Sequence, residues 1–259
     1  MKGKKLRANR IFTYKPQNNS IYFARLFLLV FMKNTFTGSF IHYSRIAGIS
    51  ILLLLISQPL WAHVVVGELE KMSKSRAALV YLGLGYKHIL PLGFDHILFI
   101  LSLFLLSPKL KPVLWQATAF TVAHSVTLGL AMYHVITPPS SIVEPVIAMS
   151  IMYVALENIF SPKLKTSRIG VVFLFGLVHG MGFAGALGHL GLPKDAYLTC
   201  LVMFNLGVEL GQLTVILTAY FLLARYFGDK PYYRKRIVIP LSIVIAAIAC
   251  FWTIQRLFF

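Results

Sequence analysis

The sequence predicts an all-α membrane protein, a bundle of six transmembrane helices that follows an N-terminal signal or anchor segment. Of its 259 residues, 58% are hydrophobic and only 13% are charged. Soluble domains have about 45–50% apolar and about 25% charged residues, so this composition excludes an ordinary soluble protein and makes the lipid bilayer its expected surroundings. Because backbone polar groups cannot stay unpaired in lipid, the spans are expected to be helices.

The chain is also strongly basic, with 25 Lys and Arg against 8 Asp and Glu and a formal charge of +17. Nucleic acid binding needs a water-exposed basic face, which so apolar a chain does not offer. We therefore expect no nucleic acid partner and assign the cations to the flanks of membrane spans. Cys200 and Cys250 lie in apolar runs, so neither a disulfide nor a thiolate metal site is expected.

Residues 1–62 are interpreted as an N-terminal extension that ends in a signal peptide. Arg45 precedes an apolar core at 46–57, and Ala62 supplies a small residue at the expected cleavage point. The residue at the −3 position is a leucine, which fits cleavage poorly and leaves an uncleaved anchor as the alternative. Met32 is a second candidate start, because a chain beginning there would carry a compact signal.

A short exterior segment at 63–76 is expected to lead into a transmembrane domain at 77–259. An α-helix crosses the hydrocarbon core in about 20 residues. Apolar runs of that size, bounded by charges, prolines or glycines, lie at 78–106 (broken at Pro91), 113–136, 142–160, 169–190, 196–224 and 237–257.

The connections between these runs predict the orientation of the bundle. The first, third and fifth connections carry ten cations, which are Lys109, Lys111, Lys163, Lys165, Arg168, Arg225, Lys230, Arg234, Lys235 and Arg236. The second and fourth connections carry one, Lys194. By the positive-inside rule the odd connections are cytoplasmic, so the mature N-terminus and the C-terminus face outward from a bacterial inner membrane.

Small residues indicate which helices pack closely. Gly176, Gly180, Ala184 and Gly188 recur at four-residue spacing, and Gly207 and Gly211 repeat this spacing on the next run. Such spacing lets neighbouring backbones approach, so the fourth and fifth helices are expected at the centre of the bundle.

Ionisable and amide side chains lie inside the predicted spans, where a central carboxylate costs roughly 2.5–3.5 kcal/mol on insertion scales. That cost excludes a lipid-facing placement. The residues taken as candidate metal ligands are His88, Asp95, His96, His124, Glu157, His179, Asn205 and Glu209. On a straight helix His88 and Asp95, seven apart, would share a face, as would Asn205 and Glu209, four apart. Taken singly, each residue also fits a structural hydrogen bond in a packed core.

Apart from Arg256 at the chain end of the last span, the spans contain no Lys or Arg except Lys87, near the outer end of the first. If the carboxylates are ionised, protons or a bound cation must therefore supply the counter-charge. Imidazole and carboxylate ligands suit Ni²⁺, Co²⁺, Zn²⁺ or Fe²⁺, and the lack of cysteine at the site argues against Cu⁺. The side chains that could orient the imidazoles by hydrogen bonds are Asn158, Asn205, Gln212, Ser125 and Thr127.

Several motifs resemble those of the HupE/UreJ family of bacterial membrane proteins. The strings are GYKHILPLGFDHILFILSLFLL (85–106), FTVAHSVTLGLA (120–131), VEPVIAMSIMYVALEN (143–158), FGLVHGMGFAGALGHLGLP (175–193) and FNLGVELGQL (204–213). The resemblance implies a nickel or cobalt permease with a cleaved signal and about six spans, linked to hydrogenase and urease maturation. It points to His88, Asp95, His96 and His179. The fourth run has a single histidine where hydrogenase-linked members have FHGxAHGxE, so the chain is most similar to the branch with FNxGVExGQ.

The resulting hypothesis is a permease, not an enzyme, that moves a divalent transition metal ion through an intramembrane histidine and carboxylate site. Nickel or cobalt is expected first, with zinc or iron open. An intramembrane metalloenzyme and a non-transporting accessory protein of metalloenzyme maturation remain alternatives. The sequence contains no nucleotide-binding loop. It leaves homo-oligomer formation, transport direction and coupling open.

Overall fold

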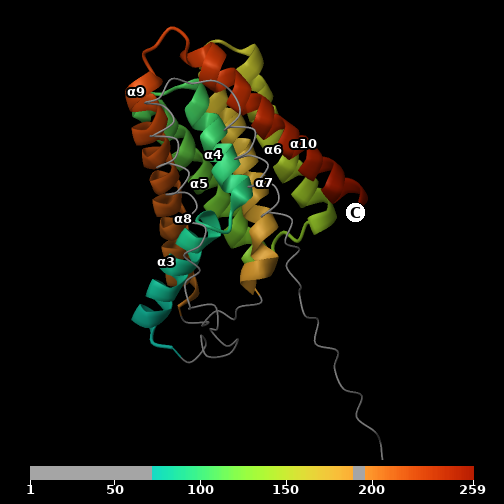
Figure 1. Ribbon diagram of the computed structural model, residues 1–259. Helices are drawn as coiled ribbons and strands as arrows, with labels where there is room; N and C mark the ends of the chain where they lie inside the picture. The colour runs from blue at the N-terminus through green and yellow to red at the C-terminus, as the bar shows by residue number, and fades with distance from the viewer. Residues whose placement is uncertain (1–71, 189–195) are drawn as a thin grey trace, which may run out of the picture. The chain divides into compact units, whose positions relative to one another are not determined.

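The computed structural model describes residues 72–188 and 196–259, and this part of the chain is helical with no strand (Figure 1). The all-α prediction is confirmed there. The signal peptide, its cleavage after Ala62 and most of the exterior segment at 63–76 fall outside the described residues, so those expectations stay predictions.

Every predicted apolar run coincides with a helix or a helix pair. The helices are α3 (Lys74–Ile89), α4 (Phe94–Leu106), α5 (Leu110–Met132), α6 (Ser140–Phe160), α7 (Arg168–Gly188), α8 (Tyr197–Ala219), which continues through η2 (Tyr220–Ala224) into α9 (Arg225–Phe227), and η3 (Arg234–Val238), which leads into α10 (Ile239–Phe258). Helix ends fall within about four residues of the predicted ones.

Within residues 72–188 and 196–259, three helical stretches are long and apolar enough to cross a membrane by themselves: Ser140–Phe160, Tyr197–Phe227 and Arg234–Phe258. α3 and α4 pass the same test as a pair, with a bend of 66° between them. Large apolar side chains point outward from the bundle, among them Trp115 at 62% and Leu198 at 66% exposure. The protein is therefore a polytopic membrane protein, although the count of six spans remains a prediction.

The first span is broken at the predicted place. α3 ends at Ile89, the Leu90–Pro91 peptide is cis, and α4 begins at Phe94. Pro91 cannot donate a backbone hydrogen bond and ends the helix. The amide of Gly93 still bonds the carbonyl of Ile89 at 3.1 Å, so the break does not leave this group unpaired. Two half-helix ends therefore meet inside the bundle. The spacing of residues on an unbroken helix does not predict how side chains on either side of this break lie.

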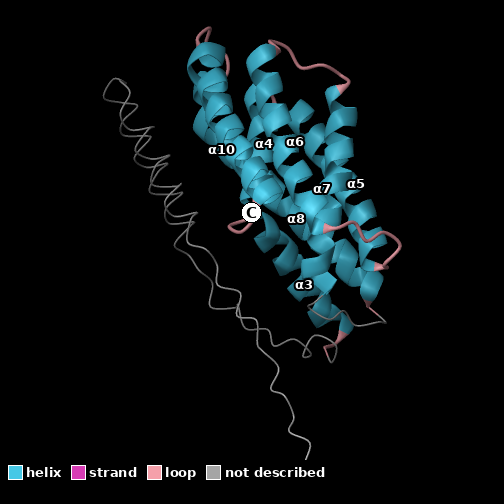
Figure 2. Ribbon diagram, turned by 90° about the vertical axis from the view of Figure 1, so that its right-hand side faces the viewer, coloured by secondary structure: helices cyan, strands magenta, loops and turns pink. Residues whose placement is uncertain are grey.

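The helices pack in pairs, α5 with α7, α3 with α8 and α6 with α10. Figure 2 shows α5 and α7 side by side. A Cβ on Gly180 would collide with the carbonyl of His124, and one on Gly207 would collide with the carbonyl of Leu82. The glycine spacing thus correctly predicted close packing by these residues, which brings the backbone of α7 against the segment of α5 that carries His124.

The connections α4–α5, α6–α7 and α9–η3 lie at one end of the bundle, the upper end in Figure 1. We call this the basic end, because these connections and the helix ends that flank them carry Lys109, Lys111, Lys163, Lys165, Arg225 and Lys230. α5 starts at the basic end, whereas α8 runs toward it.

Candidate metal centre

Three histidines from three helices meet at the break in the first span. His88 lies in the last turn of α3, His96 in the first turn of α4, and His124 near the middle of α5. One nitrogen from each lies within 4.8 Å of the others. The ring centroids of His88 and His96 are 4.6 Å apart, and those of His96 and His124 are 5.9 Å apart. We call these residues the histidine cluster.

The cluster lies in the interior of the bundle, and one nitrogen of each ring lacks a hydrogen-bond partner among the described residues. His96 is 6% exposed, His124 is fully buried, and His88 is half-buried. The Nε2 atom of each of the three rings is buried without a partner among the described residues. Buried polar atoms are nearly always satisfied, so three unsatisfied ring nitrogens in one place indicate a ligand site.

Asn205 from α8 orients His124. Its Oδ1 lies 3.4 Å from Nδ1 of His124, and its own Nδ2 donates to the carbonyl of Leu201 at 2.9 Å. Holding one ring nitrogen in this way directs the other toward the cluster. Of the proposed orienting residues, Asn205 therefore has this role, and it lies beside the cluster instead of supplying one of its grouped ligand atoms.

His179 from α7 flanks the cluster, with its ring centroid 5.1 Å from that of His96. The Ser150 hydroxyl donates to the carbonyl of Ile147 at 2.7 Å, so it accepts from Nε2 of His179, 3.0 Å away. This arrangement fixes the tautomer with a lone pair on Nδ1, which is buried without a partner among the described residues. His179 is available as a fourth nitrogen ligand. Sequence reasoning did not assign Ser150 to it.

Aromatic rings enclose these imidazoles. The Phe183 ring lies 3.9 Å from that of His88, and the Phe120 ring lies 4.9 Å from that of His179, measured between centroids. Phe99 is 5.4 Å from His179 in the same measure. An apolar wall of this kind excludes water, so an ion here depends on protein ligands for its coordination.

Comparison with known proteins agrees with the predicted resemblance. A family model described as HupE / UreJ protein matches residues 66–256, which covers all the described helices except the last two residues of α10. The chain belongs to the HupE/UreJ family. No curated protein and no solved structure matches it. The family is associated with nickel or cobalt transport or with metalloenzyme maturation, so a site for a metal ion is consistent with membership.

The carboxylates of this HupE/UreJ protein lie outside the histidine cluster. Asp95 binds Arg256 at the end of α10, whose Nη2 lies 3.0 and 2.9 Å from the two carboxylate oxygens. The second guanidinium nitrogen of Arg256 donates to the carbonyl of Glu144 at 3.1 Å. The straight helix on which His88 and Asp95 would share a face is not formed, because the break at 90–93 interrupts the helical phase between them.

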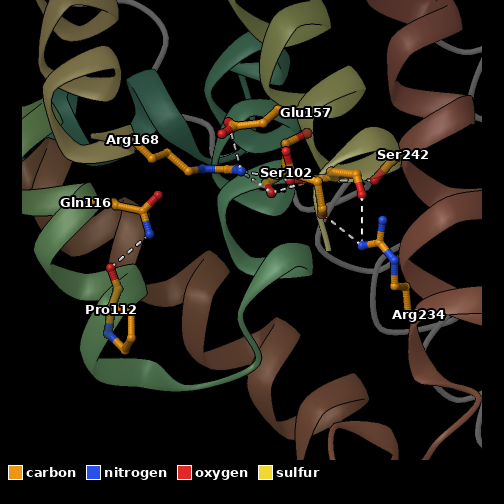
Figure 3. A network of polar contacts seen from close by, with 9 residues as sticks. Ser102, Pro112, Gln116, Glu157, Arg168, Arg234 and Ser242 are labelled. Atoms are coloured by element: carbon orange, nitrogen blue, oxygen red, sulfur yellow. Dashed lines mark hydrogen bonds and ion pairs between the residues drawn. The ribbon is translucent and has the colours of Figure 1, made fainter. Parts of the chain in front are cut away.

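Glu157 belongs to a second polar network nearer the basic end (Figure 3). Its carboxylate lies 3.0 Å from Nη1 of Arg168, which is 1% exposed. Arg168 also donates to Oδ1 of Asn158 at 3.0 Å and to the carbonyl of Ser102 at 3.3 Å. The network ties α4, α6 and α7 together and lies apart from the histidines; we call it the arginine lock.

Two arginines therefore correct the charge argument made from the sequence. Arg168 was assigned to a connection and Arg256 to the outward chain end, yet they pair with Glu157 and Asp95. Glu209 differs, because its Oε1 accepts a hydrogen bond from Thr118 at 2.9 Å and the described part of the chain offers it no ion pair. The structure thus brings together His88, His96, His124 and, beside them, His179 and Asn205 from the predicted set.

Proposed function

We propose that the protein is a permease for a divalent transition metal ion, and that the histidine cluster coordinates the ion during its passage. The observation that carries the proposal is the convergence of three imidazoles, one ring nitrogen of each within 4.8 Å of the others, whose Nε2 atoms are buried without partners among the described residues. Imidazole nitrogen is a favoured ligand for Ni²⁺, Co²⁺ and Zn²⁺, and nickel or cobalt fits the family association. The protein supplies no thiolate to this site.

The broken first span supports transport over a purely structural role. Ion sites in transporters are commonly built where a discontinuous helix leaves two half-helix ends inside the membrane. Here the C-terminal end of α3 carries His88 and the N-terminal end of α4 carries His96. A site made only of neutral nitrogens can replace part of the water shell of an ion and still release it, as permeation requires.

The proposal includes six spans and a defined orientation. Three helical stretches and the α3–α4 pair qualify as spans, and α5 and α7 would bring the number to six. With the basic end at the cytoplasm, the positive-inside rule places the C-terminus outside a bacterial inner membrane. The residues before 77 would then form the signal and a short exterior segment.

Metal binding is the first test. The purified protein is titrated in detergent with Ni²⁺, Co²⁺ and Zn²⁺ separately, and bound metal is measured by elemental analysis. We expect His96→Ala and His124→Ala to lose binding. The matched control is His134→Asn, a change to an exposed histidine whose φ of 57° an asparagine accepts. Thermal unfolding confirms that each variant is folded.

Transport is the second test. The same variants are reconstituted in liposomes that contain a fluorescent chelator, and uptake of each ion is followed over time. Wild type and His134→Asn should take up at least one ion, whereas folded His96→Ala and His124→Ala should not. Equal uptake by all four proteins for every ion refutes the permease proposal.

Three histidines with further coordination positions open also resemble a catalytic zinc site, which favours a resident-metal protein as the second candidate. The permease and the resident-metal protein differ in how readily the bound metal ion dissociates. A permease should lose its ion during dialysis, whereas a metalloenzyme should retain one ion per chain through purification.

A further inference from the structure

Polar side chains continue from the histidine cluster along the seam between α5 and α8. The first contact is that of His124 with Asn205. Thr121 donates to Oε1 of Gln212 at 3.1 Å, and Thr118 donates to Oε1 of Glu209 at 2.9 Å. All three contacts join α5 to α8, and the last two lie on the side of the cluster that faces the basic end.

Two atoms in this seam are buried without partners among the described residues. They are Oε2 of Glu209 and Nε2 of Gln212, whose side chain is 1% exposed. An unpaired amide N–H or carboxylate oxygen away from water costs free energy that a packed helix pair would ordinarily avoid. The free Glu209 oxygen is a cation ligand as it stands. Gln212 can offer its Oε1 when its carboxamide turns over, because Thr121 then donates to the carbonyl of Ala117 at 3.2 Å and accepts from Nε2.

Charge adds a separate observation. Two other carboxylates of the described helices form ion pairs with arginines, Asp95 with Arg256 and Glu157 with Arg168. Among the described residues Glu209 has no ion pair, and its carboxylate accepts a hydrogen bond from the Thr118 hydroxyl. It is therefore the carboxylate whose negative charge remains available to a mobile cation.

We propose that Glu209, with Gln212, Thr118 and Thr121, forms a second, oxygen-based cation station between the histidine cluster and the basic end. This inference deepens the proposed function, on which it rests for its place in transport. The rise of an α-helix is 1.5 Å per residue, so Thr118 lies about 9 Å from His124 along α5 toward the basic end. That is a short step for an ion leaving the cluster.

The change of ligand type distinguishes the two sites. Borderline ions such as Ni²⁺ and Co²⁺ bind imidazole nitrogen well, whereas carboxylate, amide and hydroxyl oxygens suit harder ions and hold these more weakly. An ion that reaches Glu209 exchanges nitrogen ligands for oxygen ligands and gains a negative charge beside it. Weak binding there permits release toward the basic end.

The test separates this station from the histidine cluster. Glu209→Gln keeps the shape and the Thr118 contact but removes the charge, and Gln212→Met removes the amide at nearly constant size. Glu144→Gln, on an exposed residue near the opposite end, is the matched control. We expect both seam variants to bind Ni²⁺ or Co²⁺ at the cluster as wild type does, and to lose at least tenfold in liposome uptake.

A second measurement does not depend on uptake. Mn²⁺ prefers oxygen ligands, and its binding to the purified protein is followed by electron paramagnetic resonance. Glu209→Gln should abolish a Mn²⁺ site that His124→Ala and Glu144→Gln leave intact. The station is overturned if Glu209→Gln binds Mn²⁺ or takes up Ni²⁺ or Co²⁺ as wild type does. It is also overturned if Glu209→Gln loses Ni²⁺ binding at the histidine cluster as fully as it loses uptake.

The proposed function fails in a different way, if wild type binds none of Ni²⁺, Co²⁺ and Zn²⁺. Mn²⁺ binding is measured separately, so the two failures can be told apart.

Discussion

Removing the charge of Glu157 from the arginine lock tests whether this residue is structural or a metal ligand. Glu157→Gln removes the negative charge beside Arg168 and keeps the volume of the side chain. The guanidinium retains Oδ1 of Asn158 at 3.0 Å and the carbonyl of Ser102 at 3.3 Å. It is then left as a buried cation without its counter-charge.

The magnitude follows from burial. Isolating one member of a buried ion pair costs about 3–5 kcal/mol, whereas an average hydrogen bond between membrane helices contributes about 0.6 kcal/mol. The side chain of Arg168 is fully buried and that of Glu157 is 16% exposed. Partial exposure of the carboxylate screens the pair, so we expect the lower end, about 3 kcal/mol of lost unfolding free energy.

The assay is reversible unfolding in mixed micelles, followed by circular dichroism, with metal content measured on the same samples. Lys163→Gln, on the exposed α6–α7 connection, is the control and should change stability little. Adding Arg168→Met to Glu157→Gln should recover more than about 1 kcal/mol of the summed single losses, since neither charge then stays unpaired. A Glu157→Gln protein as stable as the control but depleted in metal would show that Glu157 is a ligand and that the lock is misassigned.

Two further outcomes follow from the geometry. Asp95→Asn should change metal affinity of the cluster less than fivefold, because the carboxylate binds Arg256; isothermal titration measures this, and a large loss would return Asp95 to the ligand set. Gly180→Ala should weaken metal binding, because its Cβ collides with the carbonyl of His124, whereas Gly170→Ala, with nothing within 4 Å, should not.

The helices were predictable from the sequence because lipid imposes simple constraints. A span needs about 20 apolar residues and close packing needs small ones, so both the runs and the role of Gly180 and Gly207 could be read directly. The break at Pro91 was predictable as well, because proline removes a donor. The angle that follows the break was not, since it depends on how α4 packs against its neighbours.

The candidate site was predictable in its residue types and not in its grouping. His88, His96 and His124 are far enough apart in sequence that only the bend and the α5 packing bring their rings together. The partners of the carboxylates were missed for a different reason. Arg168 and Arg256 stand at helix ends, where the positive-inside rule treats them as interfacial, and long guanidinium side chains can reach back into the bundle from there.

These arginines change what the central site does to an ion. With Asp95 and Glu157 neutralised by Arg256 and Arg168, the histidine cluster contains no compensating negative charge. A divalent cation entering it gains nitrogen ligands while losing much of its water shell in a low-dielectric interior, which limits how tightly it is held. A neutral cluster followed by Glu209, a carboxylate without an ion pair in the described part of the chain, favours an ion that moves on.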